Sequence, residues 1–139
     1  MKIIGLILLA SLSLTACVSV DVSRYIVPGE TLDKEGSYHI VISENDGHDL
    51  HELLKTNMLS KGLFVSFGTR EDMPDDVTYL VEYGGQWQWD ISWYLLNFNI
   101  RIYQPGSKLL VASSNSLRTS LGRKSAERVV VETLEQLFK

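Results

Sequence analysis

The chain has 139 residues, which is enough for one domain and too few for two. Apolar residues make up 45% of the chain and charged residues 22%, an ordinary balance for a globular protein. The formal net charge of -4 comes without the basic face that phosphate binding needs, so the composition argues against nucleic acid as a partner.

Residues 1–16 have the composition of an export signal. Lys2 provides a positive start, and the apolar run IIGLILLASLSL is shorter than the about 20 residues that a transmembrane helix requires. The run ends at LTAC, residues 14–17, where the chain has its only cysteine. This motif resembles the lipobox of bacterial lipoproteins, which are cleaved just before the cysteine.

The resemblance implies that Cys17 carries a diacylglyceryl thioether and an acylated amino group. Each buried CH₂ group contributes about 0.8 kcal/mol, so several acyl chains anchor a protein firmly where one is marginal. Val18 follows the cysteine. Among lipoproteins an aspartate there favours the inner membrane, so the resemblance implies attachment to the periplasmic face of the outer membrane. An ordinary cleaved signal peptide is the alternative.

Residues 17–36 are expected to be the lipidated cysteine and a flexible tether. Proline, glycine and charged residues dominate the second half of this segment. The run VSVDV, residues 18–22, is able to pair as an edge strand, but we favour a linker. A single domain is then expected over residues 37–139.

The domain is expected to begin with a strand, a helix and a strand. In SYHIVIS, residues 37–43, alternation predicts a strand whose His39 points away from the core. After the breaker ENDG, apolar residues at helical spacing predict a helix near residues 50–59, capped by Asn45 or Asp46. LFVSF, residues 63–67, predicts the second strand.

Two long strands follow, around the three tryptophans. Apolar residues have odd numbers over residues 79–89 and even numbers over 94–102. A hairpin with its turn near residues 90–93 explains the change. A loop with an even number of residues pairs odd-numbered residues of one strand with even-numbered residues of the other. This register sets Trp87 opposite Tyr94.

QPGS, residues 104–107, predicts a turn, after which Leu109 is expected to face Ile102. The next strand fades into small polar residues and is expected at an edge of the sheet or as a strand that leaves the sheet. Ser125 is expected to cap a final helix. The β-α-β-β-β-β-α order predicts an α+β fold, a two-layer sandwich with two helices on one face of a mostly antiparallel sheet of about five strands.

The WQWD turn at residues 87–90 and the KGL helix end at residues 61–63 resemble one uncharacterised family of small bacterial lipoproteins. The overall pattern is similar to the lipopolysaccharide-assembly lipoprotein, which has two helices on an antiparallel sheet. The resemblance covers roughly residues 37–139. It implies the fold and an envelope location, and it brings no assigned activity and no functional residues.

The sequence has no glycine-rich phosphate loop, nucleophile elbow or Cys/His pair. His48 and His51 lie among acidic residues near the start of the first helix, where a surface metal site is the alternative to helix capping. The acidic run over residues 71–76 is interpreted as a solvated loop, with a weak cation site as the alternative. We predict no catalytic residue, no metal and no cofactor.

The tryptophans have two interpretations. They either cover the end of the core, where aromatic side chains bury large areas, or form an exposed binding surface at the hairpin tip. Trp93 is expected to be exposed because it lies opposite Tyr94's face. The candidate interaction surface contains Trp93, Tyr94, Gln86, Gln88 and Asp90.

The sequence thus predicts a non-enzymatic, lipid-anchored lipoprotein that serves as an envelope assembly or interaction accessory. Its expected partners are the membrane, through the lipid on Cys17, and another envelope protein. Binding of peptidoglycan or another glycan by the hairpin tip is the first alternative. An enzyme with an unrecognised site is the second.

Overall fold

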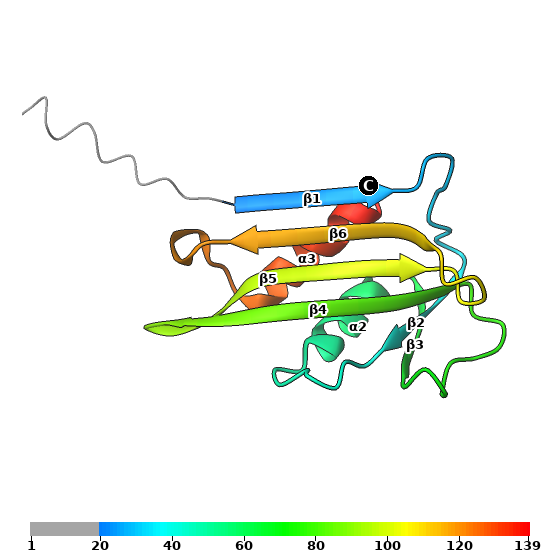
Figure 1. Ribbon diagram of the computed structural model, residues 1–139, viewed down its shortest axis with the longest axis horizontal. Coiled ribbons are helices and arrows are strands. Elements are labelled where there is room, and N and C mark those ends of the chain that lie inside the picture. Colours follow the sequence, from blue (N-terminus) through cyan, green and yellow to red (C-terminus); the bar gives the residue numbers. More distant parts are fainter. Residues whose placement is uncertain (1–19) are drawn as a thin grey trace, which may run out of the picture.

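The computed structural model describes residues 20–139, so the predicted signal peptide and Cys17 lie outside the described residues. A six-stranded sheet is covered on one face by two helices (Figure 1). The elements in chain order are β1 (Val20–Ile26), β2 (Ser37–Val41), α2 (Leu50–Ser60), β3 (Phe64–Gly68), β4 (Tyr79–Asp90), β5 (Ser92–Tyr103), β6 (Leu110–Arg118), the 3-10 turn η1 (Ser120–Gly122) and α3 (Ala126–Leu137).

The strands lie in the order β1-β6-β5-β4-β2-β3. Strand β2 runs parallel to both of its neighbours, β3 and β4, and the other pairs are antiparallel. The prediction of an α+β fold with both helices on one face is therefore confirmed. The sheet is mixed and has six strands, one more than expected.

The additional strand is β1, which lies within the segment that we expected to be a flexible tether. Its residues pair with β6 from Val20 opposite Arg118 to Ile26 opposite Ala112. The preference for a linker was wrong over residues 20–26, because alternating valines and an unpaired neighbouring strand favour pairing over a free chain. As a consequence β6 is an inner strand, and the edges of the sheet are β1 and β3.

Strand β6 is polar because it lies beneath a helix, not because it lies at an edge. Its inward side chains Ala112, Ser114 and Ser116 are at most 2% exposed, and Leu134 of α3 is fully buried. Small side chains on the strand let the helix approach the sheet closely. The β5–β6 register differs from the predicted one, since Ile102 faces Ala112 and Leu109 is 63% exposed in the turn.

The β4–β5 hairpin has the predicted sides over its body, but a different register, and near the tip Tyr94 pairs with Gln88 and lies on the face opposite Trp87. Tyr83 pairs with Ile100, whereas Trp87 pairs with Leu95, and a register shift lies between Gln86 and Trp87. This bulge adds one residue on β5, and the turn then needs only Ile91 between the two strands. The predicted pairing of Trp87 with Tyr94 was wrong, because the alternation of apolar residues in the sequence does not reveal the bulge.

His39 points away from the helices, as predicted, but it is fully buried. Its ring nitrogens lie 2.8 Å from the Ser66 hydroxyl and 2.9 Å from the Thr69 carbonyl oxygen. Arg70 forms an ion pair with Glu82 of β4. The segment between β3 and β4 therefore covers the outer face of β2, which is why a polar histidine is satisfied in the middle of the sheet.

We predict that Ile100→Asp unfolds the domain and that Asn99→Asp does not. Ile100 is fully buried and Asn99 is only partly buried on the opposite face, so only the first change places an unpaired charge in the core. Thermal unfolding followed by circular dichroism compares the two variants. Equal melting temperatures would contradict the assignment of the two faces.

Candidate functional site

The hairpin tip is the most prominent exposed apolar feature of the described chain. Trp89 and Trp93 pair across the strands and are 60% and 57% exposed, and Ile91 at the turn is 85% exposed. Trp87, farther from the turn, is partly buried and packs against the core. Trp87 therefore covers the end of the core, whereas Trp89 and Trp93 are exposed at the tip.

The aromatic rings of the tip form one connected cluster. The Trp89 and Trp93 rings lie edge to face with centroids 5.6 Å apart. His48, from the loop that precedes α2, lies 4.0 Å from the Trp87 ring and 6.2 Å from the Trp93 ring, measured between centroids. The histidine thus links the tip to the loop before α2 by ring packing.

The candidate surface predicted from the sequence is only partly assembled. Trp93, Gln86, Gln88 and Asp90 are exposed, whereas Tyr94 is 5% exposed and does not belong to the surface. The guanidinium of Arg123 lies 5.7 Å from the centre of the Tyr94 ring. The segment that leads from β6 to α3 thus approaches Tyr94, an approach that strand alternation does not reveal.

The same segment holds the turn of the hairpin. Arg123 donates a hydrogen bond of 2.6 Å to the Asp90 carbonyl oxygen, and the Ser120 hydroxyl bonds to the Asp90 carboxylate. Leu121, in η1, is 68% exposed. The tip is therefore fixed in position by polar contacts while its apolar side chains remain exposed to solvent.

Ile91 has a backbone angle φ of 63°, in the left-handed region. β-branched residues are genuine outliers there, because the side chain crowds the backbone, and glycine or asparagine usually occupies such turns. Sequence reasoning missed this residue. The sequence does show Ile91, in ISW, where a hairpin turn usually has glycine or asparagine. It lies at the point where the apolar residues change from odd to even numbers.

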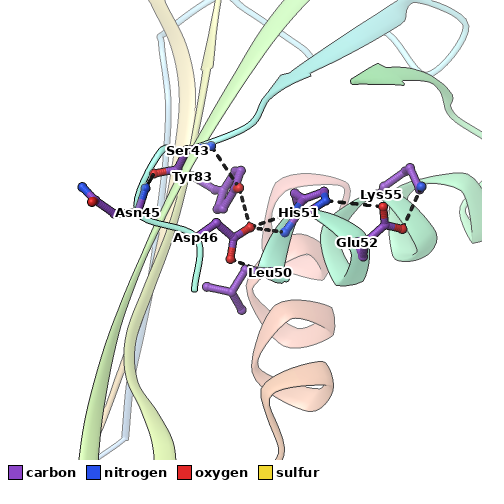
Figure 2. A network of polar contacts seen from close by, with 8 residues as sticks. All are labelled: Ser43, Asn45, Asp46, Leu50, His51, Glu52, Lys55 and Tyr83. Carbon is purple, nitrogen blue, oxygen red and sulfur yellow. Dashed lines mark hydrogen bonds and ion pairs between the residues drawn. The ribbon is translucent and has the colours of Figure 1, made fainter. Parts of the chain in front are cut away.

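A second feature is the polar network around Asp46 at the start of α2 (Figure 2). One carboxylate oxygen accepts the backbone N–H of Leu50 at 2.8 Å. The other accepts the His51 backbone N–H and ring Nδ1, both at 2.9 Å, and the Tyr83 hydroxyl at 2.7 Å. The Asp46 side chain is only 2% exposed. Asp49 occupies the N-cap position, but the side chain of Asp46, one of the two predicted caps, accepts the first N–H groups of the helix.

Two opposing effects act on the pKa of Asp46. Burial raises it, but hydrogen bonds from Tyr83, His51 and Leu50 stabilise the charged form and bring the pKa from 3.8 to about 2. A hollow of about 230 Å³ adjoins this network, with Trp87 and Tyr83 in its wall. The hydrogen bonds of Asp46 come from the start of α2 and from Tyr83 of β4, so the network ties the helix start to the sheet.

We predict that Asp46→Asn lowers the free energy of unfolding by about 1–3 kcal/mol at neutral pH, since a charged acceptor of buried donors is lost. The folded pKa of about 2 is below the ordinary value of 3.8, so the stabilisation is present above pH 3.8 and is lost as the pH falls through about 2. The difference between wild type and variant should therefore shrink in acid. Urea unfolding across this pH range measures it.

Asp49→Asn is the matched control for this prediction. Asp49 precedes the same helix and is exposed, and its side chain makes no capping hydrogen bond. A loss of stability as large as that of Asp46→Asn, or a constant difference down to low pH, would contradict the role given to Asp46.

The free edge at β3 carries a second apolar surface. Phe64 is 61% exposed, and Leu59 at the end of α2 is 49% exposed. Phe67, 45% exposed, lies on the opposite face of β3, with the Lys55 ammonium 4.1 Å from the centre of its ring. A hollow of about 410 Å³ lies beside Phe64 and Leu59, and Val77 and Pro74 form part of its wall. The unpaired backbone of β3 and this hollow together are able to accept an extended segment of another chain.

Within residues 20–139 no group of three or more histidine, cysteine, aspartate or glutamate side chains is arranged to hold a metal ion. His51 bonds to Asp46, and His48 packs on Trp87. No helix of the described segment is both long and apolar enough to cross a bilayer.

No protein-family model matches the sequence, and no curated protein matches it significantly. Among solved structures, PelC from Paraburkholderia phytofirmans, crystallised as a dodecamer, has a similar fold with a TM-score of 0.62 and 12% identity. The match covers 86% of this chain and 98% of that one. A variant of PelC with one substitution gives the same TM-score at 14% identity and covers 86% and 97% of the two chains.

A minor lipoprotein from Acinetobacter baumannii also matches, with a TM-score of 0.37, 12% identity and coverage of 77% of this chain and 89% of that one. The similarity to PelC shows a shared fold, which in this chain is an α+β domain with two helices on one face of a mixed sheet.

Proposed function

We propose that the protein is a lipid-anchored lipoprotein on the periplasmic face of the bacterial outer membrane. In this proposal it serves as a non-enzymatic assembly or interaction accessory. The observation that carries the proposal is LTAC at residues 14–17, directly before a sheet that starts at Val20. A folded domain that begins so soon after an acylated cysteine would be held at the membrane surface.

A non-enzymatic role is supported by the contacts of the carboxylate whose pKa is most perturbed. Asp46 has the most lowered carboxylate pKa that is resolved, and its oxygens are occupied by a helix start and a tyrosine of the sheet. Perturbed groups often mark catalytic sites, but structural networks perturb pKa values as well. Here the partners of the carboxylate account for the lowered pKa.

The partner that we propose is another protein of the envelope, bound at the β3 edge. Phe64 and Leu59 provide apolar anchors there, and the unpaired backbone of β3 provides hydrogen-bonding groups. PelC is described as a dodecamer, so a second copy of this chain is a further candidate for the same edge.

Glycan binding at the hairpin tip is the second candidate function. The exposed indoles of Trp89 and Trp93 beside the polar Gln88 favour it, since sugar rings stack on aromatic faces. Their edge-to-face arrangement turns part of one ring toward its neighbour and leaves less open ring surface than a coplanar pair would. We therefore rank glycan binding below a protein partner.

We predict that Cys17→Ser moves the protein from the membrane fraction to the soluble periplasm. The substitution removes the thiol that would carry the diacylglyceryl group, and no other hydrophobic anchor of comparable strength is proposed. Cell fractionation followed by immunoblotting measures the change. Ser19→Ala, two positions later in the chain, is the control and should remain with the membrane. A Cys17→Ser protein that still sediments with outer membrane would contradict anchoring at Cys17.

We predict that a photo-crosslinking amino acid at Phe64 captures one abundant envelope protein in cells. The same probe at Leu109, which is equally exposed but lies in the β5–β6 turn, should capture much less. Mass spectrometry identifies the product. A product made only of this chain would favour self-assembly. The absence of any product from position 64, with the protein on the membrane, would contradict a protein partner at this edge.

A further inference from the structure

The start of β1 fixes where a lipid on Cys17 would lie relative to the domain. Val20 pairs with Arg118, the last residue of β6. Cys17 precedes Val20 by three residues, and a fully extended chain of that length spans at most about 10 Å. The acyl chains of the proposed lipoprotein would therefore enter the bilayer close to this end of the sheet. This step rests on the proposed function.

The hairpin tip projects from the same end. Leu117, beside Arg118, pairs with Asn97, and Asn97 pairs with Gln86. From Gln86 the hairpin continues for five more residues to Ile91, a distance of about 16 Å at the rise of a β-strand. Figure 1 shows the tip reaching beyond the start of β1 at that end. The tip thus extends about as far as the tether is able to reach.

Exposed apolar side chains gather at this end of the molecule. Trp89, Ile91 and Trp93 occupy the tip, and Leu121 lies in η1, which bonds to the turn at Asp90. Val20 and Leu117, each 44% exposed, lie at the adjacent ends of β1 and β6. Clustered apolar side chains of this size, exposed on a soluble domain, indicate a surface that is covered in use.

The tip also has the chemistry of a membrane interface. Tryptophan is enriched at the level of the lipid headgroups, because its ring is amphipathic, and isoleucine favours the hydrocarbon beyond them. Ile91 is placed at the outermost position although its left-handed φ disfavours a β-branched side chain. Asparagine or glycine would remove both the conformational cost and the exposed apolar surface, so the isoleucine is unexplained by folding alone.

From these observations we infer that the hairpin tip inserts Trp89, Ile91 and Trp93 into the same bilayer that holds the lipids of Cys17. The protein then has two contacts with one membrane, a covalent anchor and an aromatic tip, and the two together orient the domain. The long axis of the sheet stands away from the membrane, and the β5–β6 turn lies at its far end.

The test uses the acylated full protein in vesicles of phosphatidylethanolamine and phosphatidylglycerol whose acyl chains are brominated. Bromine quenches an indole only when the two are in contact in the bilayer. In a variant with Trp87→Phe and Trp93→Phe, we expect Trp89 to lose emission in brominated vesicles and to show a blue shift in unbrominated ones. Circular dichroism verifies that the variant is folded.

The matched control is an exposed tryptophan at the opposite end. Leu109 is 63% exposed in the β5–β6 turn. Leu109→Trp, with the three native tryptophans replaced by phenylalanine, should show no quenching. Ile91→Asn relieves the backbone strain and removes the outermost apolar group, so it should keep the fold and weaken the quenching of Trp89.

Each outcome bears on a different proposal. Quenching of Trp89 without quenching at position 109 supports insertion. If mass spectrometry finds the acyl groups on Cys17 and the protein floats with the vesicles, but Trp89 is not quenched, insertion is overturned and the anchor stands. If Cys17 carries no acyl group, the proposed function fails and this inference fails with it. A response of Trp89 to soluble muropeptides in place of lipid would assign the tip to glycan.

Discussion

The pairing of β1 with β6 is the constraint on which the arrangement of this molecule depends. It converts the beginning of the domain from a free tether into an edge strand, with Val20 fixed opposite Arg118. It also makes β6 an inner strand, whose row of small inward side chains lies beneath α3. Backbone hydrogen bonds, more than apolar burial, hold this strand, since most of its side chains are exposed.

The alternation of the central strands made much of the fold predictable. Odd residues in β4 and even residues in β5 face the helices over the body of the hairpin, as at Tyr83 and Ile100. Strand β1 was not predictable in the same way, because whether VSVDV pairs depends on a free neighbour elsewhere in the chain. The prediction that β6 lies at an edge failed for a related reason. Small side chains are typical of an edge strand and also of a strand in close contact with a helix.

The exposure of the candidate site residues was predictable only where the adjacent residues of the same hairpin determine it. Trp93 is exposed as expected, since it lies at the end of a projecting ribbon. Tyr94 is buried where Arg123 approaches it from a distant part of the chain, and no local pattern reveals that contact. The strain at Ile91 was missed because it follows from a one-residue turn and a bulge, which depend on the register of the strands.

The direction of the strands has a consequence for how copies or partners would meet. If the sheet stands on the membrane by one end, both of its free edges, β1 and β3, point sideways, in the plane of the bilayer. Molecules confined to that plane encounter one another edge first, and confinement raises their effective concentration far above its value in free solution. An edge contact too weak to persist between dissolved domains would then be sufficient for lateral assembly, and release from the membrane would dissolve it.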